Sequence, residues 1–141
     1  MNNITSPASD DNAIEREIQA KGKTAPRVTL ADLQANIVSE HYFTAAEGAH
    51  GELIGALRRF SPTRSVATAP LSECPDPASP LDLLTFCVLV LRNGFTVTGE
   101  SACASPENFD AEIGRKIARQ NAEQKIWPLM GYALKEKLAA A

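Results

Sequence analysis

Apolar stretches in the C-terminal half of the chain predict a β-hairpin that leads toward a long helix. Residues 84–92 are rich in β-branched and aromatic types, and residues 95–98 resume that pattern after Asn93-Gly94. Because Asn-Gly tolerates positive φ angles, the pair predicts a two-residue type I′ turn. Both faces of the first strand are apolar, so we expect it to be central and covered on both sides, by helices or by another subunit.

Helical spacing then predicts a helix from Ser105 to about Trp127. Ser105 is the expected N-cap, and Pro106 follows at the first helical position, where its missing N–H costs nothing. Two adjacent apolar rows should lie on the sheet. These rows are Phe109, Ile113 and Ile117, and Ala118, Ala122 and Ile126. Pro128 should end or kink the helix before a short terminal helix over residues 130–138.

Shorter patterns in the N-terminal half predict further elements. They are helices over residues 12–21, 30–36 and 50–60 and a strand over residues 38–44. Thr29 and Asp32 resemble a capping box, and residues 61–80 hold five of the nine prolines, which predicts a long surface loop. We therefore predict an α+β fold, with an antiparallel sheet packed against C-terminal helices over residues 25–141, after a flexible arm over residues 1–24.

Composition limits the classes of partner. The net charge of −3 and the pI near 5.4 argue against binding nucleic acid by bulk electrostatics, since phosphate neutralisation needs an excess of Lys and Arg. The longest apolar run, residues 86–91, is far shorter than the roughly 20 residues that cross a bilayer. The polar N-terminus lacks the pattern of a secretion signal. We expect a cytosolic protein that does not enter a membrane.

No catalytic or metal site is predicted. Residues 99–103 approach the nucleophile pattern GxSxG but end in Cys103, and the only histidines, His41 and His50, are far away in sequence. The three cysteines are spaced by thirteen and sixteen residues, which fits neither a disulfide framework nor a zinc knuckle. A nucleotide-degrading enzyme stays open, but no set of residues argues for one.

Two arginines of the predicted C-terminal helix are the main candidates for chemistry. Arg115 and Arg119 are four residues apart, so both lie on one helical face. That face is either solvated and crossed by weak ion pairs, or it is an anion site in which two guanidinium groups grip a phosphate. Tyr42 and Phe43 point to opposite faces of their strand; one should pack in the core, and the other packs too or lies over a planar ligand.

Two stretches resemble a known family of phage proteins. Residues 84–129 contain NGFTVTGESACASPENFD and EIGRKIA, and they resemble the C-terminal signature of a family of small tailed-phage proteins known by gene-product number. Residues 25–48 resemble the N-terminal half of that family, with residues 61–80 as a variable insertion. The same signature is similar to that of the Thoeris anti-defence one proteins, which are phage sponges for cyclic nucleotides.

This resemblance implies a non-enzymatic anti-defence protein that binds immune signals without degrading them. The implied ligands are cyclic ADP-ribose isomers made by bacterial TIR enzymes and, for some members, cyclic di- or trinucleotides of the CBASS type. The resemblance also implies action in the host bacterial cytoplasm, without metal or cofactor. It further implies assembly into dimers or hexamers, with ligand pockets between subunits.

The candidate ligand residues combine this resemblance with side-chain chemistry. A sponge needs aromatic or guanidinium planes for adenine, arginines for phosphates and no catalytic base. The candidates are Phe95 and Phe109 for stacking, Arg92, Arg115 and Arg119 for phosphate, and Asn93, Asn108 and Ser101 for ribose or base edges. A nucleic-acid-binding accessory protein remains the alternative, and it would use Arg58, Arg59 and Arg64.

Overall fold

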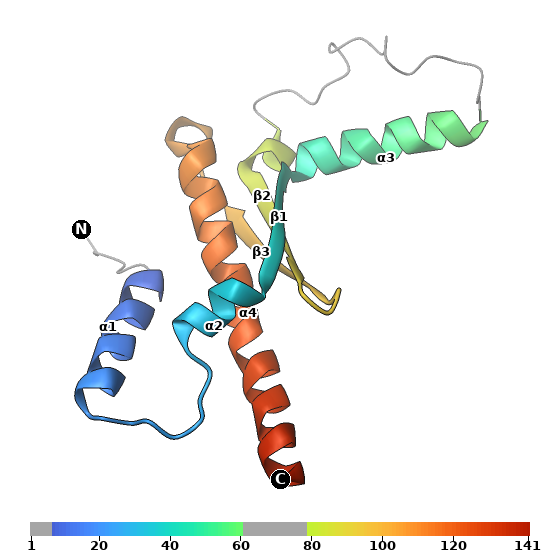
Figure 1. The fold of residues 1–141 in the computed structure, drawn as a ribbon. Helices are drawn as coiled ribbons and strands as arrows, with labels where there is room; N and C mark the ends of the chain where they lie inside the picture. Colours follow the sequence, from blue (N-terminus) through green and yellow to red (C-terminus); the bar gives the residue numbers. More distant parts are fainter. Residues whose placement is uncertain (1–6, 61–78) are drawn as a thin grey trace.

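Three antiparallel strands and one long C-terminal helix form the centre of the molecule (Figure 1). The computed structural model describes residues 7–60 and 79–141. The strands are β1 (Ile37–Thr44), β2 (Leu84–Leu91) and β3 (Thr96–Ala102), in the order β1-β2-β3. The helices are α1 (Pro7–Ala20), α2 (Leu30–Asn36), α3 (Ala45–Phe60) and α4 (Ala111–Ala140), with short 3-10 turns η3 (Pro80–Leu83) and η4 (Pro106–Asn108). This arrangement confirms the predicted α+β fold.

Strand β2 is central, as predicted, but its two faces have different surroundings. The buried face lies beneath α4 and consists of Thr85, Cys87, Leu89 and Leu91. The opposite, outer face is only partly buried and consists of Leu84, Phe86, Val88 and Val90. Among the described residues no second helix covers this outer face, because α3 projects away from the sheet (Figure 1). Within the described part of the single chain, a helix therefore covers one face of β2 and not both.

The turn between β2 and β3 differs from the predicted type I′ turn. Gly94 has a φ of +86°, whereas Asn93 does not have a positive φ. The N–H of Gly94 donates to the carbonyl of Leu91 (2.9 Å), and the N–H of Leu91 donates to the carbonyl of Phe95 (2.8 Å). Because pairing ends at Leu91 and Phe95, the loop has three residues and a left-handed glycine at its third position. The prediction of a two-residue turn was therefore wrong, because the loop is one residue longer.

Helix α4 begins later than predicted. Ser105 precedes only the short turn η4, and its side chain makes no cap hydrogen bond. Phe109 then takes an extended conformation, and Asp110 becomes the true N-cap. The Asp110 carboxylate accepts a hydrogen bond from the N–H of Ile113 (3.0 Å), which satisfies a donor that the helix start would otherwise leave unpaired.

Helix α4 also runs further than predicted, because it continues through Pro128 to Ala140. The predicted break between two helices was therefore wrong. A proline removes one helical hydrogen bond, but packing holds the helix on both sides of this one. Ile126 is fully buried, and Met130 packs against the core from the next turn.

Small residues hold α4 close to the sheet. A Cβ atom on Gly99 would lie 2.1 Å from the carbonyl oxygen of Ala118 and 2.3 Å from the nitrogen of Ala122. The helix backbone thus lies directly on β3, and the buried row contains Gly114, Ala118, Ala122 and Ile126. The prediction that Ile113 and Ile117 of the other row also lie on the sheet was wrong, since their side chains are 55% and 42% exposed. Contact through the smallest side chains turns the larger ones away from the sheet.

The N-terminal segment is anchored by a helix cap and an ion pair. The capping box of Thr29 and Asp32 starts α2 through two hydrogen bonds of 3.0 Å, as the sequence predicted. Arg27 grips Glu15 of α1 with two hydrogen bonds of 2.7 and 2.9 Å. Both α1 and α3 begin earlier than predicted. Most of the predicted proline-rich loop, residues 61–78, lies outside the described residues.

Candidate functional site

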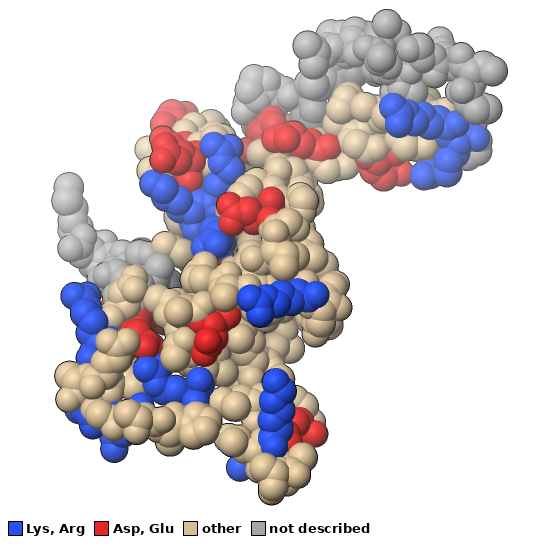
Figure 2. Space-filling view, viewed as in Figure 1, with Lys and Arg blue, Asp and Glu red and all other residues tan. Residues whose placement is uncertain are grey.

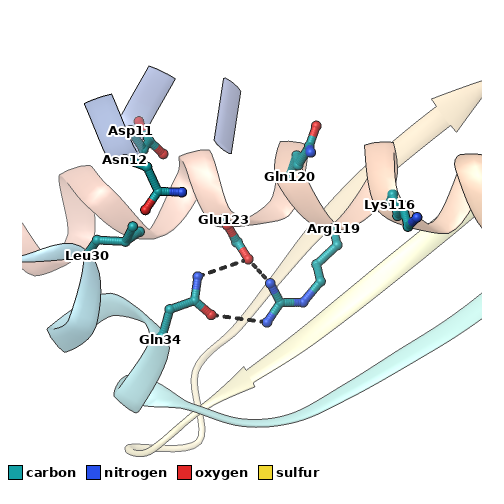
Figure 3. A pocket seen from close by; sticks show the side chains of 8 residues that line it. All are labelled: Asp11, Asn12, Leu30, Gln34, Lys116, Arg119, Gln120 and Glu123. Carbon is teal, nitrogen blue, oxygen red and sulfur yellow. Dashed lines mark hydrogen bonds and ion pairs between the residues drawn. The ribbon is translucent and has the colours of Figure 1, made fainter. Parts of the chain in front are cut away.

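A polar cluster around Arg119 joins three elements (Figure 3). Its guanidinium donates through Nε to Glu40 of β1 (2.8 Å), through Nη1 to Glu123 of α4 and through Nη2 to Gln34 of α2 (3.2 Å). Gln34 also donates to the Glu123 carboxylate (3.2 Å). Glu123 is only 5% exposed, so its charge depends on these donors for compensation. Arg119 therefore links three elements, and its charge is fully engaged by two carboxylates.

A cavity of about 230 Å³ lies beside this cluster, between α1, α2 and α4. Its walls are formed by Asp11, Asn12, Leu30, Gln34, Lys116, Arg119, Gln120 and Glu123. Figure 3 shows the Arg119 side chain reaching away from Lys116, toward Gln34 and Glu123. Lys116 itself pairs with Glu112 at 3.2 Å. Both cations of this cavity already have acidic partners, which makes it a poor anion site.

Arg115 lies one turn before Arg119 and has different surroundings. Its side chain is exposed and forms no ion pair or hydrogen bond with any residue that the structure describes. It lines another cavity of about 230 Å³, at the end of the sheet where β1 leads into α3. The other walls of this cavity, which we name the Arg115 cavity, are Tyr42, Phe43, Thr44, Glu47, Thr85, Phe109 and Ala111.

The Arg115 cavity combines the groups that a nucleotide needs. The unpaired guanidinium of Arg115 suits a phosphate, and the half-buried ring of Phe109 offers an apolar face for a base. The carboxylate of Glu47 can accept hydrogen bonds from ribose hydroxyls. Thr44 fixes this carboxylate, because its hydroxyl donates to Glu47 (3.3 Å) while accepting from the Glu47 N–H (3.1 Å).

Burial shifts the pKa of Tyr42, in the wall of this cavity, and that of its cross-strand neighbour Cys87. Burial raises the pKa of Tyr42 to about 12, with the neighbouring Cys87 thiol as the next contribution. Burial likewise raises the pKa of Cys87. Phe43, on the other side of β1, stacks on Phe86 with ring centroids 5.5 Å apart. Tyr42 thus faces α4 and Phe43 faces the outer side of the sheet, as the strand alternation predicted.

Three predicted ligand residues lie at the hairpin tip instead. The side chain of Asn93 accepts from the N–H of Phe95 (2.9 Å), so its oxygen serves the turn. Phe95 is 54% exposed. Arg92 lines a cavity of about 490 Å³ with the last turns of α4, including Met130 and Lys137.

The remaining two candidates lie at the opposite end of the sheet. Ser101 pairs with Thr85 across β2 and β3 and is partly buried. Asn108 is exposed and donates to the Ser105 hydroxyl (3.2 Å). Neither lines the Arg115 cavity.

The eight predicted residues therefore do not form one site within the chain. Met130, beside Arg92, follows Arg115 on the same helix by fifteen residues, which is about 22 Å at 1.5 Å per residue. Two of the eight, Phe109 and Arg115, line the same cavity. Sequence reasoning missed Glu47 and Thr85. The T-x-x-E spacing of Thr44 and Glu47 is a capping-box signal that could have placed this carboxylate at a helix start.

The charged surface gives little support to nucleic-acid binding. Arg58 and Arg59 are exposed in the last turn of α3, whereas Arg64 lies outside the described residues. Figure 2 shows Lys and Arg atoms separated by acidic and uncharged ones on the face in view, rather than gathered in one patch. In the described ranges no group of His, Cys, Asp and Glu could hold a metal ion, and no helix is long and apolar enough to span a membrane.

Comparison with known proteins identifies the family. Residues 28–138 match the phage protein (N4 Gp49/phage Sf6 gene 66) family. The chain belongs to this family. The matched segment contains the whole sheet and α2, with all but the end of α4, so it includes the Arg119 cluster and the Arg115 cavity. No significant match was found among curated proteins or solved structures.

Proposed function

We propose that this phage-family protein sequesters cyclic nucleotide immune signals in the host bacterial cytoplasm, without degrading them. The observation that carries the proposal is the guanidinium of Arg115, which has no partner among the described residues, beside Phe109 and Glu47. Cyclic ADP-ribose isomers are the first candidate ligands, because of the resemblance to the Thoeris anti-defence one proteins. CBASS-type cyclic oligonucleotides are the second.

The difference between Arg115 and Arg119 supports placing the phosphate at Arg115. A phosphate that bound Arg119 would compete with the carboxylates of Glu40 and Glu123. Displacing the guanidinium would leave Glu123 buried without its cation, which costs about 3–5 kcal/mol. Arg115 carries no such cost, so its full charge-assisted hydrogen-bonding capacity is available to a ligand.

The size of the Arg115 cavity supports a site shared between copies of the chain. Ligand pockets usually measure about 300–1,000 Å³ and bury most of the ligand, whereas this cavity is about 230 Å³. A second copy that packs over the cavity would supply the missing wall. We therefore propose that the binding species is a homo-oligomer, a dimer or a hexamer.

The test is calorimetric titration of a cyclic ADP-ribose isomer into the wild type and Arg115→Gln. We expect the variant to bind about 10- to 100-fold more weakly, since a hydrogen bond to a charged group contributes about 1.5–3 kcal/mol. The matched control is Lys116→Gln, which removes a cation from the next position, where it pairs with the exposed Glu112. This control should bind like the wild type.

Two results would overturn the proposal. If Arg115→Gln bound the ligand as tightly as the wild type does, the phosphate would not bind in this cavity. A ligand that is consumed over time, rather than recovered intact after heat denaturation, would make the protein an enzyme. A parallel titration with labelled DNA at two salt concentrations tests the accessory-protein alternative, since phosphate binding to DNA weakens steeply with salt.

A further inference from the structure

The cavity around Arg92 is lined by both apolar and polar residues. It measures about 490 Å³ and lies between the segment before α2, α2 itself, the hairpin tip and the last turns of α4. The apolar lining residues are Val28, Ala35, Met130, Ala133 and Leu134. The polar lining residues are Arg27, Asp32, Asn36, Arg92 and Lys137.

Three of the polar lining residues already have hydrogen-bond or ion-pair partners. Arg27 is bound by both oxygens of Glu15, which raises the pKa of Arg27 and lowers that of Glu15. The carboxylate of Asp32 accepts the N–H of Thr29 in the capping box. The side-chain oxygen of Asn36 accepts the backbone N–H of Arg92 (3.3 Å).

The two other cations that line the cavity have no such partner among the described residues. The side chains of Arg92 and Lys137 are exposed and have no ion pair or hydrogen-bond partner among the residues in the described ranges. Arg92 is nevertheless held at its backbone, because its N–H also donates to the carbonyl of Asn36 (3.0 Å). With Arg27 balanced by Glu15 and Asp32 opposed by two free cations, the cavity keeps an excess of positive charge beside an apolar surface.

We propose that this cavity is a second binding site, for a small organic anion with one phosphate or similar oxyanion group on an apolar or aromatic body. Arg92 and Lys137 bind the anionic group. Met130 and Leu134 contact the apolar body, where a polarisable thioether and a branched aliphatic chain pack well against a ring. The volume lies within the range of about 300–1,000 Å³ for small-molecule pockets.

This site is independent of the Arg115 cavity, which lies near the other end of the sheet. The probe is 8-anilinonaphthalene-1-sulfonate, an aromatic anion whose fluorescence rises in an apolar site. We expect saturable binding of one dye per chain. Arg92→Gln with Lys137→Gln should weaken it at least about tenfold, since both charge-assisted contacts to the sulfonate are lost. Lys135→Gln is the control and should leave it unchanged.

Competition between the dye and two phosphates tests whether the apolar lining residues contact the ligand. Phenyl phosphate should displace the dye at a concentration at least about tenfold lower than inorganic phosphate, because the ring adds buried apolar area. Equal displacement by the two competitors would overturn the role of Met130 and Leu134. Unchanged dye binding in the Arg92 and Lys137 variant, with native circular dichroism, would overturn the site as a whole. Neither result would alter the expected effect of Arg115→Gln on cyclic ADP-ribose binding.

Discussion

Arg115 and Arg119 show that the surroundings of a side chain decide its role more than its type does. Both are arginines on one face of one helix, separated by a single turn. Glu40, Gln34 and Glu123 surround the guanidinium of Arg119, whereas that of Arg115 faces a cavity. The first holds β1, α2 and α4 together, whereas the second has no ion pair or hydrogen bond with any described residue.

Tyr42 provides a prediction at the same scale, because its pKa is raised from 10.0 to about 12 by burial. The folded protein holds this proton more tightly than the unfolded chain does. The associated stability is therefore fully present below pH 10 and is lost as the pH rises from about 10 to about 12. Denaturant unfolding of the wild type, followed by the fluorescence of the single tryptophan, Trp127, should show this loss.

Tyr42→Phe is the matched variant, since it keeps the ring and removes the ionising hydroxyl. Its stability should fall less steeply than that of the wild type above pH 10. Part of the fall should remain, because burial also raises the pKa of Cys87. Parallel pH profiles for the two proteins would show that Tyr42 ionises as freely in the folded state as in the unfolded chain.

The contact between α4 and the sheet depends on one glycine. Gly99→Ala would place a Cβ atom within 2.1 Å of the backbone of Ala118, and helix backbone cannot move aside as a side-chain end can. Overpacking costs about 1–3 kcal/mol and occasionally more, so we expect a loss of at least about 3 kcal/mol. Denaturant unfolding monitored by circular dichroism measures it.

Gly131→Ala is the control for that substitution. Gly131 lies within α4 and has nothing within 4 Å of its added Cβ atom. Alanine there should stabilise the protein by about 0.5–1 kcal/mol, through its higher helix propensity. Equal effects of the two substitutions would mean that α4 does not rest on Gly99.

Sequence patterns predicted the elements better than their contacts. The bounds of α2 and its Thr29–Asp32 cap follow from residues within one turn of each other, and local signals of this kind are readable. The rotation of α4 is set by Gly99, which no periodicity within the helix reveals. The turn at Asn93 depends on where cross-strand pairing stops.

The candidate site was less predictable for the same reason. The four-residue spacing of Arg119 and Glu123 is a local signal for their ion pair. No local spacing could show Glu40, which is 79 residues away along the chain and binds Arg119 as a second carboxylate. Arg92 and Arg115 were grouped by chemistry alone, whereas the length of α4 separates them.

At the scale of the whole molecule, the outer face of the sheet is an apolar surface that no helix covers among the described residues. Its central stripe is Leu84, Phe86, Val88 and Val90, and β1 and β3 add mostly polar neighbours such as His41, Thr98 and Glu100. An apolar centre with a polar rim is typical of protein interfaces. We therefore expect the proposed homo-oligomer to form through this face.

Val88→Glu tests that expectation, because Val88 lies in the middle of the stripe, between His41 and Thr98. An unpaired carboxylate in a buried contact costs several kcal/mol, so the dissociation constant of the assembly should rise at least about 100-fold. Sedimentation equilibrium measures this change, and circular dichroism checks that the fold is kept. Ile113→Glu places the same charge on the exposed side of α4, away from the sheet. If that variant dissociates while Val88→Glu stays assembled, the contact between copies runs through α4 and the outer face stays in solvent.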